Sequence, residues 1–277
     1  MNGKICMVTG ANAGIGKVTA RELAKMGAHV VMVCRSAERG EAAKKEVTQT
    51  ATGQVDLMIA DLSSQASIRA LAATYLEKYD RLDVLINNAG VLFMERSESV
   101  DGLEMTFALN HMGYFLLTDL LLDRIKASAP ARIVNVSSMA HSRGAINFDD
   151  LQAEQKFGGM DVYSSSKLAN ILFTTELARR LDGTGVTANS LHPGFVRSNF
   201  GDNNGRLMKI VMPIAKLFAI NTDKGAETSI YLASSPDVEG VTGLYFVKKK
   251  AVTPSEAAQE TAVAERLWQV SEALLRG

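Results

Sequence analysis

The sequence predicts an α/β fold: a doubly wound sheet of seven parallel strands with helices on both of its faces. Short apolar runs alternate with helical patterns along the chain, which is typical of consecutive strand–helix–strand units. No linker or low-complexity segment interrupts this alternation, so we assign residues 1–277 to a single domain. Nearly every apolar run ends in small or polar residues, as expected where ligands bind beyond the carboxyl ends of the strands.

The apolar runs predicted as strands are residues 5–9, 29–34, 54–59, 82–86, 132–136, 186–191 and 241–247. The helical patterns follow Gly16 and cover residues 38–50, 65–78, 101–126 (interrupted at Gly113) and 160–181. An amphipathic C-terminal helix is expected within 254–277, where Ser255 can cap it. The basic run 248–250 is expected to be a solvated turn.

The composition argues against several classes of function. The chain has 30 basic and 30 acidic residues, so its charge gives no reason to expect binding to nucleic acid. The first residues do not resemble a signal peptide, and no window of 18 residues is uninterruptedly apolar, so no transmembrane segment is expected. Cys6 and Cys34 lie inside apolar runs and are expected to be reduced thiols, with no metal site. These features favour a cytoplasmic protein.

A glycine-rich turn follows the first predicted strand. Gly10, Gly14 and Gly16 lie between this strand and a helical pattern, and a second strand completes the unit. Glycines here permit a tight turn and let the backbone approach a pyrophosphate, which the N-terminus of the next helix can bind. Ordinary turns and helix caps also use glycine, so the turn is informative mainly because it lies between a strand and a helix.

Tyr163 and Lys167 are four residues apart and therefore share one face of the predicted helix 160–181. The residues around them are largely apolar, as in a helix packed in a protein interior. An ammonium group beside a phenol favours the phenolate, which makes tyrosine a usable acid near neutral pH. Such pairs are also common on solvated helix faces, so this interpretation depends on the rest of the chain.

Several short motifs follow one another along the chain, and their ordered set resembles that of the short-chain dehydrogenase/reductase family. The stretches 8–17, 163–173 and 186–194 are most similar to the retinol dehydrogenase branch. The resemblance implies a Rossmann-type fold. The residues that carry it are Thr9, Gly10, Gly14, Gly16, Asp61, Asn87, Asn88, Ala89, Gly90, Asn110, Ser138, Tyr163, Lys167, Pro193 and Gly194.

This resemblance implies catalytic roles for four residues. Tyr163 would be the general acid in carbonyl reduction and the base in alcohol oxidation. Lys167 would lower the pKa of Tyr163 and hold the nicotinamide ribose, while Asn110 would hold a water that links Lys167 to solvent. Ser138 would hydrogen-bond the substrate oxygen. Ser137 competes for that role, because alternation lets only one of the two face the site, and the family's use of the second serine favours Ser138.

The resemblance also implies a nicotinamide cofactor, which supplies the hydride. NAD-specific proteins place an acidic residue at the end of the second strand. Here Arg35 occupies that place, and the first carboxylate after the second strand is Glu38. NADP is therefore predicted, because a guanidinium suits a 2′-phosphate. The alternative is that Arg35 is an ordinary solvated side chain. The predicted cofactor-binding residues are Gly10, Asn12, Gly14, Ile15, Gly16, Arg35, Asp61, Leu62, Asn88, Ala89, Gly90, Tyr163, Lys167, Pro193, Gly194 and Val196.

The segment 195–222 lies where the family places its substrate loop. Residues 207–220 are strongly apolar, which favours a lipophilic, retinal-like aldehyde or ketone, or the corresponding alcohol, as substrate. A lid helix that merely packs on the core would show the same pattern. The interspersed Arg206, Lys209 and Lys216 would also suit a weak contact with a membrane surface.

The connection from Ser138 to Tyr163, residues 139–160, is longer than is common in the family, although the retinol dehydrogenase branch shares this feature. His141 within it is expected at the surface; the alternative is that it reaches the mouth of the substrate pocket. The apolar helices 105–122 and 160–181 favour a homodimer, because the family commonly joins subunits through them.

Two other functions stay open. One is a reductase for a large pigment-like ring, since protochlorophyllide reductases share these motifs. The other is a non-catalytic NADP-sensing regulatory protein, which loss of Tyr163, Lys167 or Ser138 would mark. All three residues are present.

Overall fold

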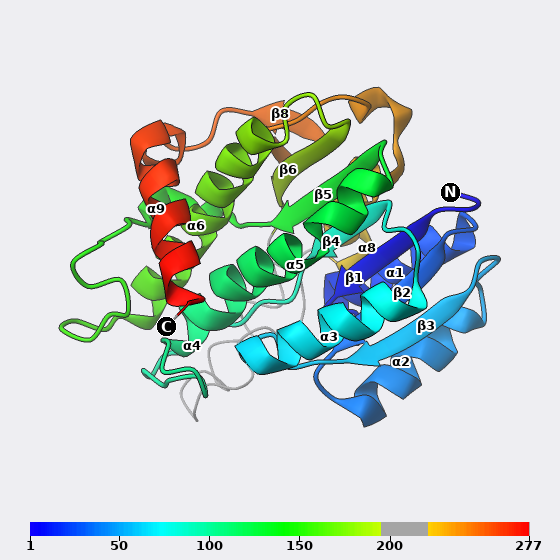
Figure 1. Ribbon diagram of the computed structural model, residues 1–277, viewed down its shortest axis with the longest axis horizontal. Helices are drawn as coiled ribbons and strands as arrows, with labels where there is room; N and C mark the ends of the chain where they lie inside the picture. The colour runs from blue at the N-terminus through cyan, green and yellow to red at the C-terminus, as the bar shows by residue number, and fades with distance from the viewer. Residues whose placement is uncertain (195–220, 277) are drawn as a thin grey trace.

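A computed structural model describes residues 1–194 and 221–276, which form a sheet with strand order β3-β2-β1-β4-β5-β6-β7-β8 (Figure 1). The predicted α/β class with helices on both faces is confirmed. Seven strands are parallel: β1 (Ile5–Thr9), β2 (His29–Cys34), β3 (Val55–Ile59), β4 (Val84–Asn87), β5 (Ala131–Val136), β6 (Val186–His192) and β7 (Tyr245–Val247). The eighth, β8 (Lys250–Val252), is antiparallel to β7.

The predicted strand number, seven, is therefore wrong by one. Lys248 and Lys249 have φ of 50° and 65° and form the turn of a hairpin between β7 and β8. Lys250 begins the exposed edge strand instead of belonging to a solvated turn. Lysine is depleted in strands, which hides β8 from sequence analysis, but it suits an exposed sheet edge because it discourages further strand pairing.

Side chains alternate along each central strand between two buried layers. Met7 belongs to one hydrophobic cluster, and its neighbours Cys6 and Val8 belong to the other. The first face is covered by α3 (Gln65–Lys78), α5 (Gly113–Ala127) and α6 (Gly159–Arg180) (Figure 1). The second is covered by α1 (Gly14–Lys25), α2 (Ala37–Thr48) and α8 (Thr222–Ser234). Burial on both faces explains why the strands are continuous apolar runs in the sequence.

The direction in which strands are added to the sheet reverses between β1 and β4. From β1 the chain moves outward through β2 and β3, and it then returns to β4 on the other side of β1. The loops after β1 and β4 diverge at this point, and ligands of open α/β sheets bind in the crevice that such a reversal creates. The glycine-rich turn lies there.

Two predicted helices differ from the structure. The helix predicted at 101–126 consists of a short α4 (Met105–Phe107), a π-helical turn (Ala108–Met112) and α5. The C-terminal helix α9 spans Thr261–Leu274, after a short 3-10 turn (Glu256–Gln259). The Ser255 hydroxyl makes no capping hydrogen bond, so the predicted cap is wrong. Among the described residues, no helix has the length and apolar character that crossing a membrane requires.

Helix α9 packs on α6 and α5 (Figure 1). The buried Trp268 stacks on Phe173 of α6 at 5.7 Å between ring centroids and meets Phe115 of α5 edge-on at 4.8 Å. The Arg180 guanidinium lies 4.2 Å from the Trp268 ring centroid. Helix α9 of the same chain therefore covers Phe115 and Phe173 on the two helices through which a dimer was predicted.

Candidate active site

The turn between β1 and α1 is shaped for the close approach of a phosphate. Gly10 and Gly14 have φ of 65° and 56°, a region that glycine adopts without strain. A Cβ on Gly16 would collide with the Gly10 carbonyl oxygen and with the Asn88 side chain. Ala13 is the N-cap residue of α1, and its methyl side chain cannot cap the first N–H groups of this helix. A dinucleotide pyrophosphate fits these free donors.

The loop after β4 supports this turn. Thr9 Oγ1 accepts hydrogen bonds from the N–H groups of Asn88 and Ala89, at 2.8 and 3.1 Å. Asn88 Nδ2 donates to the Thr9 carbonyl at 2.7 Å. These bonds join the ends of β1 and β4 across the crevice. Asn12 and Ile15 lie in the turn itself and are partly exposed, as cofactor contact requires.

The ends of β2 and β3 bring Arg35 and Asp61 together. Arg35 Nη1 lies 3.8 Å from Asp61 Oδ2, and 62% of the Arg35 side chain is exposed. Asp61 Oδ1 accepts hydrogen bonds from the N–H and the hydroxyl of Ser63 at 2.9 and 2.6 Å. Ser36 caps α2 by accepting from the Arg39 N–H, so a second helix N-terminus begins beside Arg35.

Helix α6 places Lys167 in the interior next to Tyr163. Lys167 Nζ donates to the Val136 carbonyl at 3.2 Å and lies 5.7 Å from the centroid of the Tyr163 ring. Burial disfavours the ammonium and lowers the pKa of Lys167 to about 7. Burial also raises the pKa of Tyr163 to about 12, although the hydrogen bond with the Ser138 hydroxyl acts in the opposite direction.

These directions differ from the expectation that Lys167 lowers the pKa of Tyr163. Each group is buried, and burial favours the neutral phenol and the neutral amine alike. A lysine with a pKa near 7 is only partly charged at neutral pH, which weakens its pull on the phenol. In the described residues, the influence that lowers the pKa of Tyr163 comes from Ser138.

The two serines at the end of β5 make different contacts. Ser137 is buried, and its hydroxyl donates to the Lys167 carbonyl at 2.6 Å, inside helix α6. Ser138 hydrogen-bonds Tyr163, and its Oγ accepts from the Ala140 N–H at 3.2 Å. Of the two candidates, the geometry favours Ser138 as the serine of the site.

Asn110 lies in the π-helical turn and is fully buried. Its Oδ1 accepts from the Val91 N–H at 2.8 Å, and its Nδ2 donates to the Val91 carbonyl and to Ser166 Oγ at 2.9 and 3.0 Å. A Cβ on Gly90 would lie 3.3 Å from Lys167 Nζ, so this segment adjoins the lysine. The side chain expected to hold a relay water is thus bonded to protein groups.

The structure describes Leu62, Pro193 and Gly194 of the remaining predicted cofactor residues, but not Val196. Leu62 is buried, and its carbonyl packs against Gly113 at the start of α5. Pro193 and Gly194 follow β6 and are partly exposed, Gly194 with φ of 94°. The structure does not describe residues 195–220. These include Val196, the apolar stretch 207–220, the basic residues Arg206, Lys209 and Lys216, and all but the last two positions of the predicted substrate loop.

Comparison with known proteins decides the family. A family model described as short chain dehydrogenase matches residues 4–207. The chain belongs to the short-chain dehydrogenase family. Human retinol dehydrogenase 14 is 47% identical over 293 residues, covering 99% of this chain and 87% of the relative. Mouse retinol dehydrogenase 12 is 47% identical over 274 residues, with 99% and 86% covered. These similarities confirm the predicted family and its retinol dehydrogenase branch.

Solved structures share the fold of this short-chain dehydrogenase. An uncharacterised protein from Mycobacterium paratuberculosis superposes with a TM-score of 0.79 at 35% identity, covering 99% of this chain and 94% of the other. A Pseudomonas aeruginosa RhlG/NADP active-site complex has a TM-score of 0.71 at 28% identity, with 89% and 94% covered. As a family member, the chain is an oxidoreductase that interconverts carbonyl and alcohol groups with a nicotinamide cofactor.

Sequence analysis of this short-chain dehydrogenase missed three residues beside the site. The ring of Tyr114 lies 5.7 Å from Lys167 Nζ, and its buried hydroxyl bonds to none of the described residues. His141, predicted at the surface, is only 4% exposed and bonds to the Ser138 carbonyl. His192 accepts a hydrogen bond from the Met139 N–H. In the sequence, each of the three is a side chain with a polar ring that lies within a few residues of a motif or of the end of a strand. This shared feature could have identified them.

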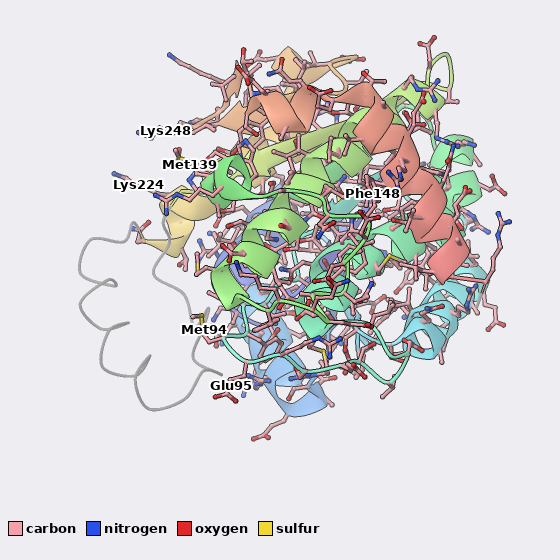
Figure 2. All side chains as sticks on the ribbon, turned by 90° about the vertical axis from the view of Figure 1, so that its left-hand side faces the viewer. Met94, Glu95, Met139, Phe148, Lys224 and Lys248 are labelled. Atoms are coloured by element: carbon pink, nitrogen blue, oxygen red, sulfur yellow. The ribbon has the colours of Figure 1, made fainter. Side chains whose placement is uncertain are left out.

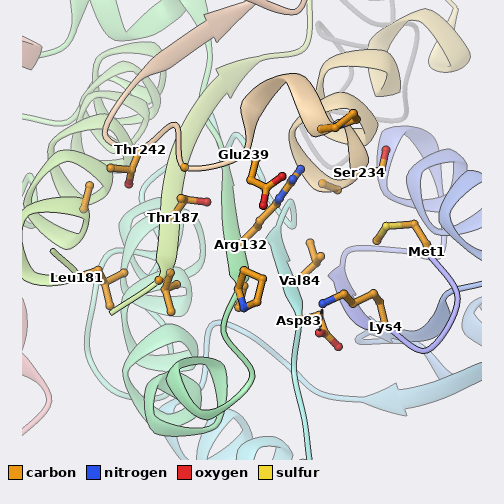
Figure 3. A pocket seen from close by; sticks show the side chains of 18 of the residues that line it. Met1, Lys4, Asp83, Val84, Arg132, Leu181, Thr187, Ser234, Glu239 and Thr242 are labelled. Carbon is orange, nitrogen blue, oxygen red and sulfur yellow. Dashed lines mark hydrogen bonds and ion pairs between the residues drawn. The ribbon is translucent and has the colours of Figure 1, made fainter. Parts of the chain in front are cut away.

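Two cavities of about 650 Å³ each open at the opposite edge of the sheet, where the strands begin. Lys4, Asp83, Arg132 and Glu239 surround the first (Figure 3). The Asp83 carboxylate bonds to Lys4 there, at 2.9 Å. Of the predicted catalytic and cofactor residues that the structure describes, none lines either cavity.

Proposed function

We propose that this short-chain dehydrogenase reduces lipophilic aldehydes or ketones with NADPH and catalyses the reverse oxidation of the alcohols. The observation that carries the proposal is the contact between Ser138 and Tyr163 beside the buried Lys167. Ser138 follows strand β5, and Tyr163 and Lys167 lie on helix α6. Gly90 lies beside Lys167 and connects this group to the crevice between β1 and β4. The glycine-rich turn between β1 and α1 lies in the same crevice.

In reduction, a bound nicotinamide cofactor would supply the hydride that the carbonyl carbon accepts. Tyr163 donates its phenolic proton to the carbonyl oxygen, so that one hydride and one proton are added and an alcohol results. The Ser138 hydroxyl donates a hydrogen bond to the same oxygen while negative charge develops on it. Oxidation uses the same groups in reverse.

Lys167 is suited to return a proton to Tyr163. A group whose pKa is about 7 exists in both protonation states at neutral pH, so it can take a proton from solvent and pass it on. Because the Asn110 side chain is bonded to Val91 and Ser166, we propose that a relay water would bind the backbone of the π-helical turn instead.

The preference for NADP rests on Arg35. Its largely exposed guanidinium follows β2 directly and lies beside the capped N-terminus of α2, which favours anions. The nearest carboxylate, Asp61, already accepts two hydrogen bonds from Ser63. A 2′-phosphate would therefore meet an exposed arginine fork whose only described ion-pair partner, Asp61, is 3.8 Å away, while the ribose of NAD would lack an acidic residue at the end of β2.

A lipophilic substrate is supported by the relatives' names and by three methionines near Tyr163. Met139 follows Ser138, and Met160 lies three residues before Tyr163 on α6. Met94 packs against Gly159 at the start of that helix. These methionines are 60%, 47% and 40% exposed, respectively, and Met94 and Met139 lie on the same side of the molecule (Figure 2). Flexible thioethers form adaptable apolar walls.

Two observations bear on the alternatives. Tyr163, Lys167 and Ser138 lie together, which argues against a purely NADP-sensing protein. A homodimer through α5 and α6 would need the face that Trp268 of α9 covers. We therefore expect a monomer as long as α9 is packed, and analytical ultracentrifugation checks this.

The test measures NADPH and NADH oxidation with retinal, decanal and a small polar ketone. We expect NADPH with retinal or decanal to be preferred. Tyr163→Phe should lower kcat by about 10²- to 10⁴-fold, as expected for loss of a general acid, while Tyr231→Phe on the remote helix α8 serves as the matched control. Unchanged turnover in Tyr163→Phe would contradict the mechanism, and preference for the polar ketone would contradict the substrate class. Turnover that requires visible light would instead support the pigment-ring reductase.

A further inference from the structure

We propose that His141 and His192 are positioning residues that clamp the peptide unit between Ser138 and Met139 and thereby aim the Ser138 hydroxyl. The inference rests on the proposed role of Ser138 and extends it to two side chains that do not touch the substrate oxygen. Each histidine holds one of the two polar groups of this peptide unit.

The clamp has two arms. His141 Nδ1 donates to the Ser138 carbonyl oxygen at 2.7 Å, and His192 Nδ1 accepts from the Met139 N–H at 3.2 Å. The carbonyl and the N–H belong to one planar group, so two bonds to its two ends fix the orientation of its plane. That orientation sets the backbone of Ser138 and hence the direction of its side chain.

Both rings must be neutral, and their hydrogen bonds fix the tautomers. A carbonyl only accepts, so His141 carries its proton on Nδ1, and its Nε2 accepts from the Ser255 N–H at 3.2 Å. His192 accepts on Nδ1, so its proton lies on Nε2. Burial keeps both neutral: it lowers the pKa of His141 and, with the neighbouring His141, lowers that of His192 to about 4.

Ser138 needs this support because of where it lies. It is the last residue before a short 3-10 helix (Met139–Arg143), a structure whose internal hydrogen bonds are poorly aligned. Its Oγ accepts from the Ala140 N–H, which leaves the hydroxyl proton for Tyr163 or a substrate oxygen. A small rotation of the Ser138–Met139 peptide would misdirect that proton.

Three elements hold the clamp in place. His192 ends β6, the Tyr245 ring of β7 meets His141 edge-on at 4.9 Å between ring centroids, and Ser255 of the C-terminal segment bonds its Nε2. The catalytic serine is therefore oriented by parts of the chain that follow it by more than fifty residues.

Asparagine and glutamine separate the arms experimentally, because an asparagine amide can replace a histidine Nδ1 and a glutamine amide can replace Nε2. His192→Asn keeps the acceptor for Met139, whereas His192→Leu removes it. His141→Asn keeps the side-chain donor to Ser138 and loses the bond to Ser255. His141→Gln does the reverse and leaves the Ser138 carbonyl only the backbone N–H of residue 141, at 3.1 Å. Thermal unfolding of each variant checks that it is folded.

We expect His192→Leu and His141→Gln to lower kcat by roughly 10- to 100-fold, because small misplacements of catalytic groups have effects of this size. The KM for NADPH should not change, and the two asparagine variants should recover most of the kcat. In a Ser138→Ala background all four substitutions should change kcat by less than about twofold, since they act through Ser138. Equal losses in both backgrounds, or no loss in either histidine series, would overturn the clamp.

A readout independent of turnover separates this inference from the proposed function. Exchange of the Met139 amide hydrogen, followed by NMR, should quicken by about tenfold in His192→Leu and not in His192→Asn, as expected for one lost hydrogen bond. Unchanged exchange in His192→Leu would overturn the clamp whatever the activity. Unchanged turnover in Ser138→Ala, with faster exchange in His192→Leu, would instead overturn the proposed role of Ser138.

Discussion

Buried polar groups lie at both ends of the parallel strands, which we call the amino edge, where the strands begin, and the carboxyl edge, where they end. The polar groups at these two edges have different partners. Where the strands begin, Asp83 accepts hydrogen bonds from Lys4, Arg81 and the Ile5 N–H, at 2.9, 2.5 and 2.8 Å. Where the strands end, the N-terminus of α1 has no side-chain cap, and Lys167 donates to a backbone carbonyl instead of a carboxylate.

This difference separates polar groups that stabilise the fold from polar groups that are available to a ligand. At the amino edge, Asp83 is paired with basic groups, which favour its ionised form and lower its pKa. At the carboxyl edge, burial without a counter-charge shifts the pKa of Lys167 to about 7. Shifts of this kind are characteristic of functional sites.

The largest effect in this comparison is expected for a substitution of Lys167 at the carboxyl edge. Lys167→Met should lower kcat by roughly 10²- to 10³-fold through loss of electrostatic and proton-relay support, yet it should stabilise the protein. Between pH 7 and 10.5, Lys167 is protonated in the unfolded chain but not in the folded chain. The buried lysine therefore lowers the free energy of unfolding at pH 7, and this effect becomes smaller as the pH rises. Urea unfolding should show a gain of roughly 2–4 kcal/mol at pH 7 that shrinks toward pH 10.

The exposed Lys45 provides the control for this substitution. Lys45→Met removes the same charge from the surface of α2 and should change neither kcat nor stability appreciably. A Lys167→Met protein that is less stable than wild type at pH 7 would show that the lysine is compensated after all.

The next effect lies at the amino edge. Asp83→Ala should reduce the unfolding free energy by about 3 kcal/mol, because it leaves the partly buried Ile5 N–H without its acceptor and breaks two ion pairs. The folded variant should keep the wild-type kcat. Urea unfolding and steady-state kinetics measure the two quantities, with Glu77→Ala on the exposed face of α3 as control. A tenfold fall in kcat would refute the assignment of this edge to stability.

A smaller effect is expected at the rim of the carboxyl edge. Arg35→Glu should lower kcat/KM for NADPH by roughly 10- to 100-fold, because a charge-assisted bidentate contact is replaced by repulsion, and should leave the value for NADH unchanged or higher. Initial rates with each cofactor measure it. Lys45→Glu makes the same charge change farther along α2, and equal losses in the two variants would mean that Arg35 acts only through net charge.

The smallest effect concerns His111, whose buried ring bonds Ser271 of α9 through Nε2 at 2.8 Å. Burial lowers the pKa of His111 to about 3, so below pH 6.5 the unfolded chain binds a proton that the folded chain excludes. Stability is therefore lost as pH falls from 6.5 toward 3, by about 1.4 kcal/mol at pH 5.5. In His111→Asn this part of the pH dependence should disappear from urea unfolding curves; an unchanged slope would assign it to other groups.

The sequence predicted the parts of the fold and site that local pattern determines. The strand β1, the glycine turn and the Tyr163–Lys167 spacing on α6 all follow from short-range periodicity. Distant contacts determine what it missed. His141 is buried because Ser255, distant in the chain, bonds its ring, and the strand β8 exists because β7 offers an unpaired edge to residues of low strand propensity.

Helix α9 has a consequence for how the enzyme is made. The ribosome releases the N-terminal residues first, so β1, the glycine turn and β2 can assemble while α6 still lacks the cover that Trp268 gives to Phe173. The helix that carries Tyr163 and Lys167 becomes fully packed only after residue 274 has emerged. We therefore expect nascent chains to acquire the nucleotide-binding turn before they acquire an ordered acid–base pair.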